Sequence, residues 1–295
     1  MPSAPRLSPG RWGGQRRRMK NIGGKVIFFV VGVWLVAQGR AAEAGLVTRE
    51  WTVDGVVRKA LVRVPANAAG TAAPVVFAFH GHGGTMTQAA RSFGMHTRWP
   101  EAIVVYPQGL PTAGMTDPQG KLPGWQKAPG DYADRDLRFF DAVFATLKAE
   151  SKVDGRRVFA TGHSNGGQFT YLLWAMRGDL FAAMAPSAAA PGLGWYERLR
   201  PKPALHVAGT NDELVKFAVQ ERAMKVVRTL NGCAAEGTAW AQAGPITGTL
   251  YPSQTGTPLV ALIYPGTHKY PAEAPSLIVS GLGPSARVTV PEHEV

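Results

Sequence analysis

Arg157-Val-Phe-Ala-Thr-Gly-His-Ser-Asn-Gly-Gly167 is the most informative segment of this 295-residue sequence. The apolar run Arg157–Thr161 leads into a G-x-S-x-G pattern centred on Ser164, and a helical pattern follows over Gln168–Met176. A strand that turns sharply into a helix through this pattern is typical of a nucleophile elbow, in which the serine is held in a strained conformation. Glycines flank the serine because side chains there would clash with neighbouring backbone. The segment therefore predicts Ser164 as a nucleophile.

The sequence around this segment alternates short β-rich runs with helical patterns. This alternation predicts a single catalytic domain over residues 45–295, with a mostly parallel central sheet and helices on both faces. Together with the elbow, it leads us to expect the α/β-hydrolase fold. The Gly- and Pro-rich residues 107–133 predict a long loop over one end of the sheet. Leu46–Val53 and Lys59–Val64 are expected to form an antiparallel pair that turns at Asp54-Gly55. Further strands are expected at Pro74–His80, Ala102–Tyr106, Arg157–Thr161, Ala182–Pro186, Ala204–Ala208 and Leu259–Tyr264. Covering helices are expected at Asp136–Ser151 and Gln220–Asn231.

The segment His80-Gly-His-Gly-Gly84 follows the strand expected at Pro74–His80. A glycine-rich loop at this place supplies one backbone N–H of an oxyanion hole, and the residue after the nucleophile, Asn165, supplies the other. For the loop's N–H we favour His82 over Gly83. The side chain of His80 is expected to be structural, and a direct role in proton transfer for the His80 or His82 side chain is the alternative.

A serine nucleophile needs a base, and in this architecture the acid and the histidine follow the serine in chain order. Three histidines lie downstream of Ser164. His206 falls within an apolar strand and His293 lies in the polar C-terminal tail. His268 comes just after the run Leu259–Tyr264, where a catalytic histidine is expected, and is therefore the predicted base.

The acid should follow a strand that lies between the serine and the histidine in the chain. Asp212 comes shortly after Ala204–Ala208, within Gly209-Thr-Asn-Asp-Glu213, and Glu213 is the second candidate. We expect His268 to take the proton of Ser164 and Asp212 to fix the imidazole tautomer. This chemistry needs no cofactor, and no metal-binding motif such as H-E-x-x-H or paired cysteines is found in the sequence.

Taken together, these motifs resemble the poly(3-hydroxybutyrate) depolymerase-like and feruloyl esterase-like family of the α/β-hydrolase superfamily. The resemblance spans most of residues 55–275 and also rests on Tyr106-Pro-Gln-Gly109, Gly124-Trp-Gln126 and Gly266-Thr-His268. It differs where many relatives have a cysteine in place of His82 and a Trp-Pro pair after the catalytic histidine. These differences leave the reacting residues intact but affect the substrate pocket.

The resemblance implies a serine esterase that forms an acyl-enzyme on Ser164. Its substrates would be small-molecule or oligomeric esters of short-chain, hydroxyalkanoate-type or feruloyl and acetyl groups. Trp125 and Trp195 are candidates for the substrate pocket, although tryptophans in loops more often pack against the core. The alternatives are a secreted serine peptidase of the same fold and an envelope binding protein that has lost turnover.

Residues 1–44 read as an N-terminal extension followed by a signal peptide over 19–44. Lys20 and Lys25 precede the apolar run Val26–Ala37, and Ala42-Glu-Ala44 provides a small-residue cleavage site. The apolar run is too short to span a bilayer as a permanent helix, so we expect export to the periplasm or medium without stable membrane insertion. Met19 is an alternative start.

The net charge of +12 would suggest a nucleic-acid partner if the charge were spread over the folded chain. However, a large share of the basic residues lies in residues 1–44, where Glu43 is the only acidic one. The remaining sequence carries no recognisable nucleic-acid motif, so no nucleic-acid partner is expected. Cys233 is the only cysteine, which excludes an intramolecular disulfide.

Overall fold

The computed structural model describes residues 45–283. The N-terminal extension and signal peptide expected in residues 1–44, and His293, lie outside these residues. Within the described part of the chain, no helix is both long and apolar enough to cross a membrane.

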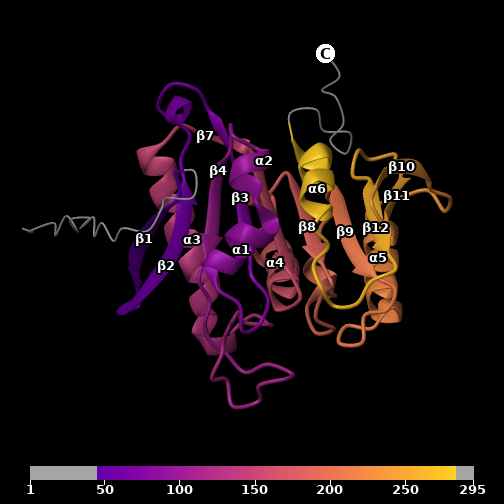
Figure 1. Ribbon diagram of the computed structural model, residues 1–295, viewed down its shortest axis with the longest axis horizontal. Coiled ribbons are helices and arrows are strands. Elements are labelled where there is room, and N and C mark those ends of the chain that lie inside the picture. The colour runs from indigo at the N-terminus through magenta and orange to yellow at the C-terminus, as the bar shows by residue number, and fades with distance from the viewer. Residues whose placement is uncertain (1–44, 284–295) are drawn as a thin grey trace, which may run out of the picture. The chain divides into compact units, whose positions relative to one another are not determined.

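A ten-stranded sheet forms the centre of the fold (Figure 1), in the order β1-β2-β4-β3-β7-β8-β9-β12-β11-β10. The neighbours from β4 to β12 in this order are parallel, and antiparallel strands extend the sheet at both ends. The expected mostly parallel α/β sheet is confirmed. The strands are β1 Val47–Val53, β2 Val56–Arg63, β3 Ala73–Phe79, β4 Ile103–Pro107, β7 Val153–His163, β8 Ala183–Ser187, β9 Ala204–Gly209, β10 Thr238–Ala243, β11 Ile246–Tyr251 and β12 Leu259–Tyr264.

Helices cover both faces of the sheet. One buried cluster joins the sheet to α3, α4 and α5, and a second joins it to α1, α2 and α6. Because the parallel strands are apolar on both faces, both layers of helices bury hydrophobic side chains against them. The helices are α1 Met86–Phe93, α2 Met95–Arg98, α3 Arg135–Glu150, α4 Asn165–Arg177, α5 Phe217–Leu230 and α6 Ala274–Leu282.

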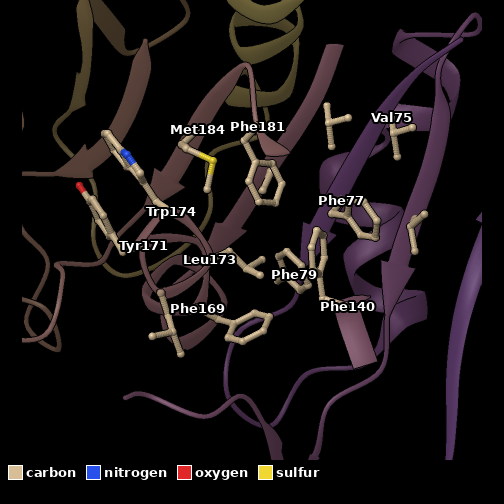
Figure 2. Close-up of a cluster of buried hydrophobic side chains, with 14 of the residues drawn as sticks. Val75, Phe77, Phe79, Phe140, Phe169, Tyr171, Leu173, Trp174, Phe181 and Met184 are labelled. Carbon is tan, nitrogen blue, oxygen red and sulfur yellow. The ribbon is translucent and has the colours of Figure 1, made fainter. Parts of the chain in front are cut away.

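The core beneath the elbow is rich in aromatic side chains (Figure 2). Phe77 and Phe79 of β3 face the helices α3 and α4. The ring of Phe79 meets that of Phe169 edge to face, with centroids 5.0 Å apart. Aromatic pairs in this arrangement add to the stabilisation that burial alone provides. This packing fixes α4, whose first residue follows Ser164, against the end of β3.

The first two strands turn where the sequence predicted. Asp54 and Gly55 adopt positive φ angles of 51° and 77°, as a two-residue hairpin turn requires. Residues 107–133 contain more structure than the expected loop. Two short strands, β5 Leu110–Pro111 and β6 Pro123–Gly124, pair there in a separate small sheet.

Candidate active site

Ser164 occupies a sharp turn between β7 and α4. Its backbone angles are φ 57° and ψ −121°, a conformation that residues with a side chain rarely adopt. Its N–H donates to the carbonyl of Ser187 at 2.9 Å, and its carbonyl accepts the N–H of Gln168 at 2.8 Å. The turn is therefore held from the neighbouring strand and from the first turn of α4.

The glycines of the elbow are required by close contacts with backbone. A Cβ atom on Gly162 would lie 2.3 Å from the carbonyl oxygen of Gly166, and one on Gly166 would lie 2.2 Å from that of Phe79. Such distances are far below van der Waals contact. The glycines let α4 approach the end of β3 closely enough to present Ser164 beside the loop that follows β3.

The structure brings the three predicted catalytic side chains together. The Ser164 hydroxyl lies 2.7 Å from Nε2 of His268, and Nδ1 of His268 lies 2.8 Å from Oδ2 of Asp212. Asp212 follows β9 and His268 follows β12, so each side chain reaches the site from the carboxyl end of a parallel strand. Because Asp212 accepts from Nδ1–H, Nε2 is left free to accept the serine proton.

Asp212 is buried and held by several hydrogen bonds. Its Oδ1 accepts the N–H groups of Leu214 and Val215 at 2.9 and 2.8 Å. Its Oδ2 accepts from Nε2 of Gln220 at 3.1 Å in addition to His268. The second candidate, Glu213, is exposed and has none of these contacts. This arrangement favours Asp212 as the carboxylate that orients the imidazole.

The loop after β3 lies next to the nucleophile. A Cβ atom on Gly81 would lie 3.5 Å from Cβ of Ser164. Gly83 N–H is already engaged, since it donates to the carbonyl of Pro123 at 2.7 Å. The N–H groups of His82 and Asn165 donate to no other group among residues 45–283. His82 and Asn165 thus remain available as oxyanion donors, and the N-terminal end of α4 adds its positive dipole there.

The two histidine side chains of this loop contact protein groups. His80 is buried, and its Nδ1 lies 2.7 Å from the carbonyl of Gly81 while its Nε2 accepts the N–H of Gly109 at 2.9 Å. Burial lowers the pKa of His80 to about 4, so the ring is neutral and structural. The His82 ring lies 3.4 Å from Asp117 Oδ2.

Both tryptophans proposed for the substrate pocket lie in the core instead. Trp125 is fully buried, and its indole N–H donates to the carbonyl of His80 at 2.9 Å. Trp195 is 5% exposed, and its indole N–H donates to the carbonyl of Lys127 at 3.2 Å. Neither lines the cavity of about 130 Å³ beside the loop His80–Gly84. The residues that line this cavity include Gly81, His82, Ser92, Phe93, His163 and Tyr270. The ring of Trp125 stacks on that of Phe169 in α4, with centroids 5.3 Å apart.

Asn165 links the nucleophile's helix to the long loop. Its Oδ1 accepts the N–H of Trp125 at 2.7 Å, and its Nδ2 donates to the carbonyl of Trp125 at 3.0 Å. This reciprocal pair fixes the loop residues beside the site. It also satisfies the backbone N–H and C=O of Trp125, which is buried.

Sequence reasoning did not single out Gln220, Ser187 or His163, which support the reacting residues. Gln220 is buried and contacts Asp212, and His163 and Ser187 contact each other and the reacting residues. The signal for His163 is its position directly before the nucleophile. His206 is buried, with Nδ1 2.9 Å from the hydroxyl of Tyr171, as its place within an apolar strand suggested.

Among residues 45–283, no group of three or more His, Cys, Asp or Glu side chains is arranged to hold a metal ion. Near Ser164, His268 contacts Asp212 and the serine hydroxyl, and His80 accepts the N–H of Gly109. Chemically, the arrangement offers a serine hydroxyl in contact with an imidazole, which in turn contacts a buried carboxylate. Serine hydrolases of the α/β-hydrolase fold use the same groups.

Comparisons with known proteins agree with this class. Residues 125–197 match the prolyl oligopeptidase family. A bifunctional acetylxylan esterase/xylanase of Neocallimastix patriciarum is 28% identical over 186 residues, which cover 61% of this chain and 25% of that protein. A probable feruloyl esterase C of Aspergillus clavatus is 28% identical over 149 residues, covering 48% of this chain and 50% of that one. The matches thus span between a quarter and half of the length of these relatives.

Among solved structures, a ferulic acid esterase superposes with a TM-score of 0.58 at 14% identity, covering 82% of this chain and 98% of that one. At this identity the likeness establishes the fold. The sequence matches show that the chain is similar to acetylxylan and feruloyl esterases. The expected likeness to poly(3-hydroxybutyrate) depolymerases stays a prediction.

Proposed function

We propose that this protein is a carboxylic-ester hydrolase that forms an acyl-enzyme on Ser164. The observation that carries the proposal is the continuous chain of contacts from the Ser164 hydroxyl through His268 to Asp212. The acetylxylan and feruloyl esterases among its relatives support ester hydrolysis in particular. The substrates we propose are short-chain, hydroxyalkanoate-type or feruloyl and acetyl esters.

In the first half of the reaction, Oγ of Ser164 attacks the ester carbonyl carbon while Nε2 of His268 takes the hydroxyl proton. The carbonyl oxygen becomes negative and is received by the N–H groups of His82 and Asn165. Asp212 stabilises the imidazolium without taking its proton. The carbon–oxygen bond to the alcohol then breaks, and His268 returns the proton to the leaving oxygen.

In the second half, a water molecule takes the place of the alcohol. His268 removes one of its protons as it attacks the acyl carbon, and the same donors receive the second oxyanion. The bond to Ser164 breaks, Oγ regains its proton from His268 and the carboxylic acid leaves. The contacts of His268 with Ser164 and Asp212 support these proton transfers.

A second candidate function is peptide hydrolysis, which the match of residues 125–197 to the prolyl oligopeptidase family favours. Serine esterases and serine peptidases share the chemistry of attack and differ in the leaving group. Esters and amides with the same acyl group therefore separate the two. Turnover of p-nitrophenyl acetate or butyrate with no cleavage of the matched anilide supports the esterase, whereas faster cleavage of the anilide overturns it in favour of the peptidase.

We further propose that residues 19–44 are a signal peptide and that the exported protein begins at Gly45. Cleavage after Ala44 would come before β1, which begins at Val47. N-terminal sequencing of protein recovered from the periplasm or medium tests this proposal. A chain that stays in the cytoplasm with its N-terminus intact would contradict it.

A further inference from the structure

His163 is the last residue of β7 and directly precedes the nucleophile, yet its side chain contacts the loop that carries the proposed base. Its Nε2 lies 2.8 Å from the main-chain carbonyl oxygen of His268. Its Nδ1 lies 3.2 Å from Oγ of Ser187. The rings of His163 and His268 lie with their centroids 5.0 Å apart. The residue before Ser164 thus bridges the end of β8 and the loop of His268 at the carboxyl end of the sheet.

The chemistry of these partners fixes the proton on His163. A carbonyl oxygen only accepts, so Nε2 must carry the hydrogen and Nδ1 must accept from the Ser187 hydroxyl. Burial, followed by the nearby His268, lowers the pKa of His163 to about 4. The ring is therefore neutral at the pH where the proposed reaction runs, and it places no charge against the imidazolium that forms on His268.

Ser187 serves both the nucleophile and this histidine. Its carbonyl accepts the N–H of Ser164 at 2.9 Å, and its hydroxyl is the partner of His163. It is 1% exposed at the end of β8, a rigid parallel strand next to β7. Ser187 at the end of β8 therefore holds both the side chain of His163 and the backbone turn at Ser164.

The loop of His268 is held at several points, and one of them is the N–H of Asn211, which donates to the carbonyl of Gly266 at 3.0 Å. The hydroxyl of Tyr264 contacts the carbonyls of Thr267 and Lys269, at 2.9 and 2.5 Å. The carbonyl between them, that of His268 itself, is held by His163. A displacement of about 1 Å at a catalytic group can lower a rate by about 10²-fold. The hydrogen bond from His163 acts on the residue whose placement matters most.

We propose that His163 is a positioning residue, which sets the distance from His268 to Ser164 through its hydrogen bond to the His268 carbonyl. The proposal rests on the proposed function, because the distance from His268 to Ser164 affects the rate only if His268 takes the proton of Ser164. It assigns no contact with substrate to His163. The proposal says that a hydrogen-bond donor at Nε2 is required to place His268. A ring of this size without the donor would not be enough.

The matched variants are His163→Phe, which keeps a ring but loses both hydrogen bonds, and His163→Gln, which keeps a donor near the place of Nε2. With p-nitrophenyl acetate, we expect His163→Phe to lower kcat by about 10–100-fold with little change in KM, because the rate depends on the placement of His268. His163→Gln should recover most of the lost kcat. Equal kcat for wild type and His163→Phe would overturn the proposal, as would an equal loss in both variants.

A spectroscopic signature separates positioning from general support of the fold. The proton shared by His268 Nδ1 and Asp212 should give a far-downfield ¹H NMR resonance in the wild type. We expect this resonance to shift or broaden in His163→Phe and to be kept in His163→Gln, in samples whose circular dichroism and thermal melting show a folded chain. An unchanged resonance in His163→Phe would overturn the proposal.

The resonance also distinguishes a failure of the positioning role of His163 from a failure of the proposed function. If the wild type hydrolyses no ester, the proposed function fails, while a resonance lost in His163→Phe and kept in His163→Gln would still support the positioning role. If the wild type is active and His163→Phe is equally active with the same resonance, the positioning role fails and the proposed function stands.

Discussion

The hydroxyl of Ser164 lies 2.7 Å from Nε2 of His268, although 104 positions separate the two residues in the sequence. The order of the sheet explains their meeting. The strands β7, β8, β9 and β12 are successive neighbours, and Ser164, Ser187, Asp212 and His268 lie at or beyond their carboxyl ends in that same order. Ligand and catalytic groups of open α/β sheets gather at this edge.

Replacing Asp212 by Asn should abolish most activity without unfolding the protein. The amide would favour the wrong tautomer of His268, a change that costs about 10⁴-fold in kcat in serine proteases. Glu213→Gln is the matched control, since Glu213 is exposed and should leave kcat within about twofold. Steady-state kinetics on p-nitrophenyl acetate checks both. A large loss in Glu213→Gln with activity kept in Asp212→Asn would exchange their roles.

Adding a methyl group to Gly166 should damage the elbow. The new Cβ would lie 2.2 Å from the carbonyl oxygen of Phe79 and 2.5 Å from that of His80, so α4 would have to move away from β3. We expect Gly166→Ala to lower the free energy of unfolding by about 3 kcal/mol or more, as overpacking against rigid backbone does.

The control for this variant is Gly155→Ala in the exposed first part of β7, where a Cβ would meet nothing within 4 Å. It should change the free energy of unfolding by less than about 1 kcal/mol. Urea denaturation of both variants measures the difference. Equal stability of Gly166→Ala and the wild type would mean that the close approach of α4 to β3 is not required.

Acid should destabilise the fold through its buried histidines. Burial lowers the pKa values of His80, His163 and His206 from 6.5 to about 4. Between these values the unfolded chain binds protons that the folded chain excludes. Stability therefore falls as the pH drops from about 6.5 to about 4, by roughly 1.4 kcal/mol per pH unit for each histidine, and is unaffected by these groups above that window.

Urea denaturation at intervals from pH 7.5 to 4.5 measures this slope. The variant His206→Gln, which replaces a histidine outside the reacting groups, should have a shallower slope than the wild type. A wild-type free energy of unfolding that stays constant from pH 6.5 to 4.5, or an unchanged slope in His206→Gln, would contradict the expected burial of neutral histidines.

The parallel strands could be predicted from the sequence because they leave strong local signals. The reacting residues proposed from similar signals stay a prediction, which the contacts of His268 support. Pro74–His80 and Leu259–Tyr264 are continuous apolar runs, and the turn glycines around Ser164 are dictated by backbone contacts. The chain order of serine, acid and histidine then restricted the choice to residues at strand ends. The structure places Asp212 and His268 where that order requires them.

Elements with weaker patterns were not predicted. The helix α1 contains few large apolar residues and depends on a capping box between Thr85 and Gln88. The strands β10 and β11 are partly exposed and lack a continuous apolar run, so the sequence pattern did not predict their antiparallel pairing. The side chains of His163 and Gln220 reach the site through tertiary contacts, which no local pattern encodes. Trp125 and Trp195 were candidates for the substrate pocket, with packing against the core as the commoner role of such tryptophans, and both are buried.

The central claim is that Ser164 carries out ester hydrolysis, and its most direct measurement is the turnover of p-nitrophenyl acetate by residues 45–295 beside the Ser164→Ala variant, with fluorophosphonate labelling of both. We predict turnover and labelling at Ser164 in the wild type, and the loss of both in Ser164→Ala while thermal melting stays close to that of the wild type. Turnover that persists in Ser164→Ala, or a folded wild type that neither hydrolyses the ester nor reacts with the probe, would contradict the account.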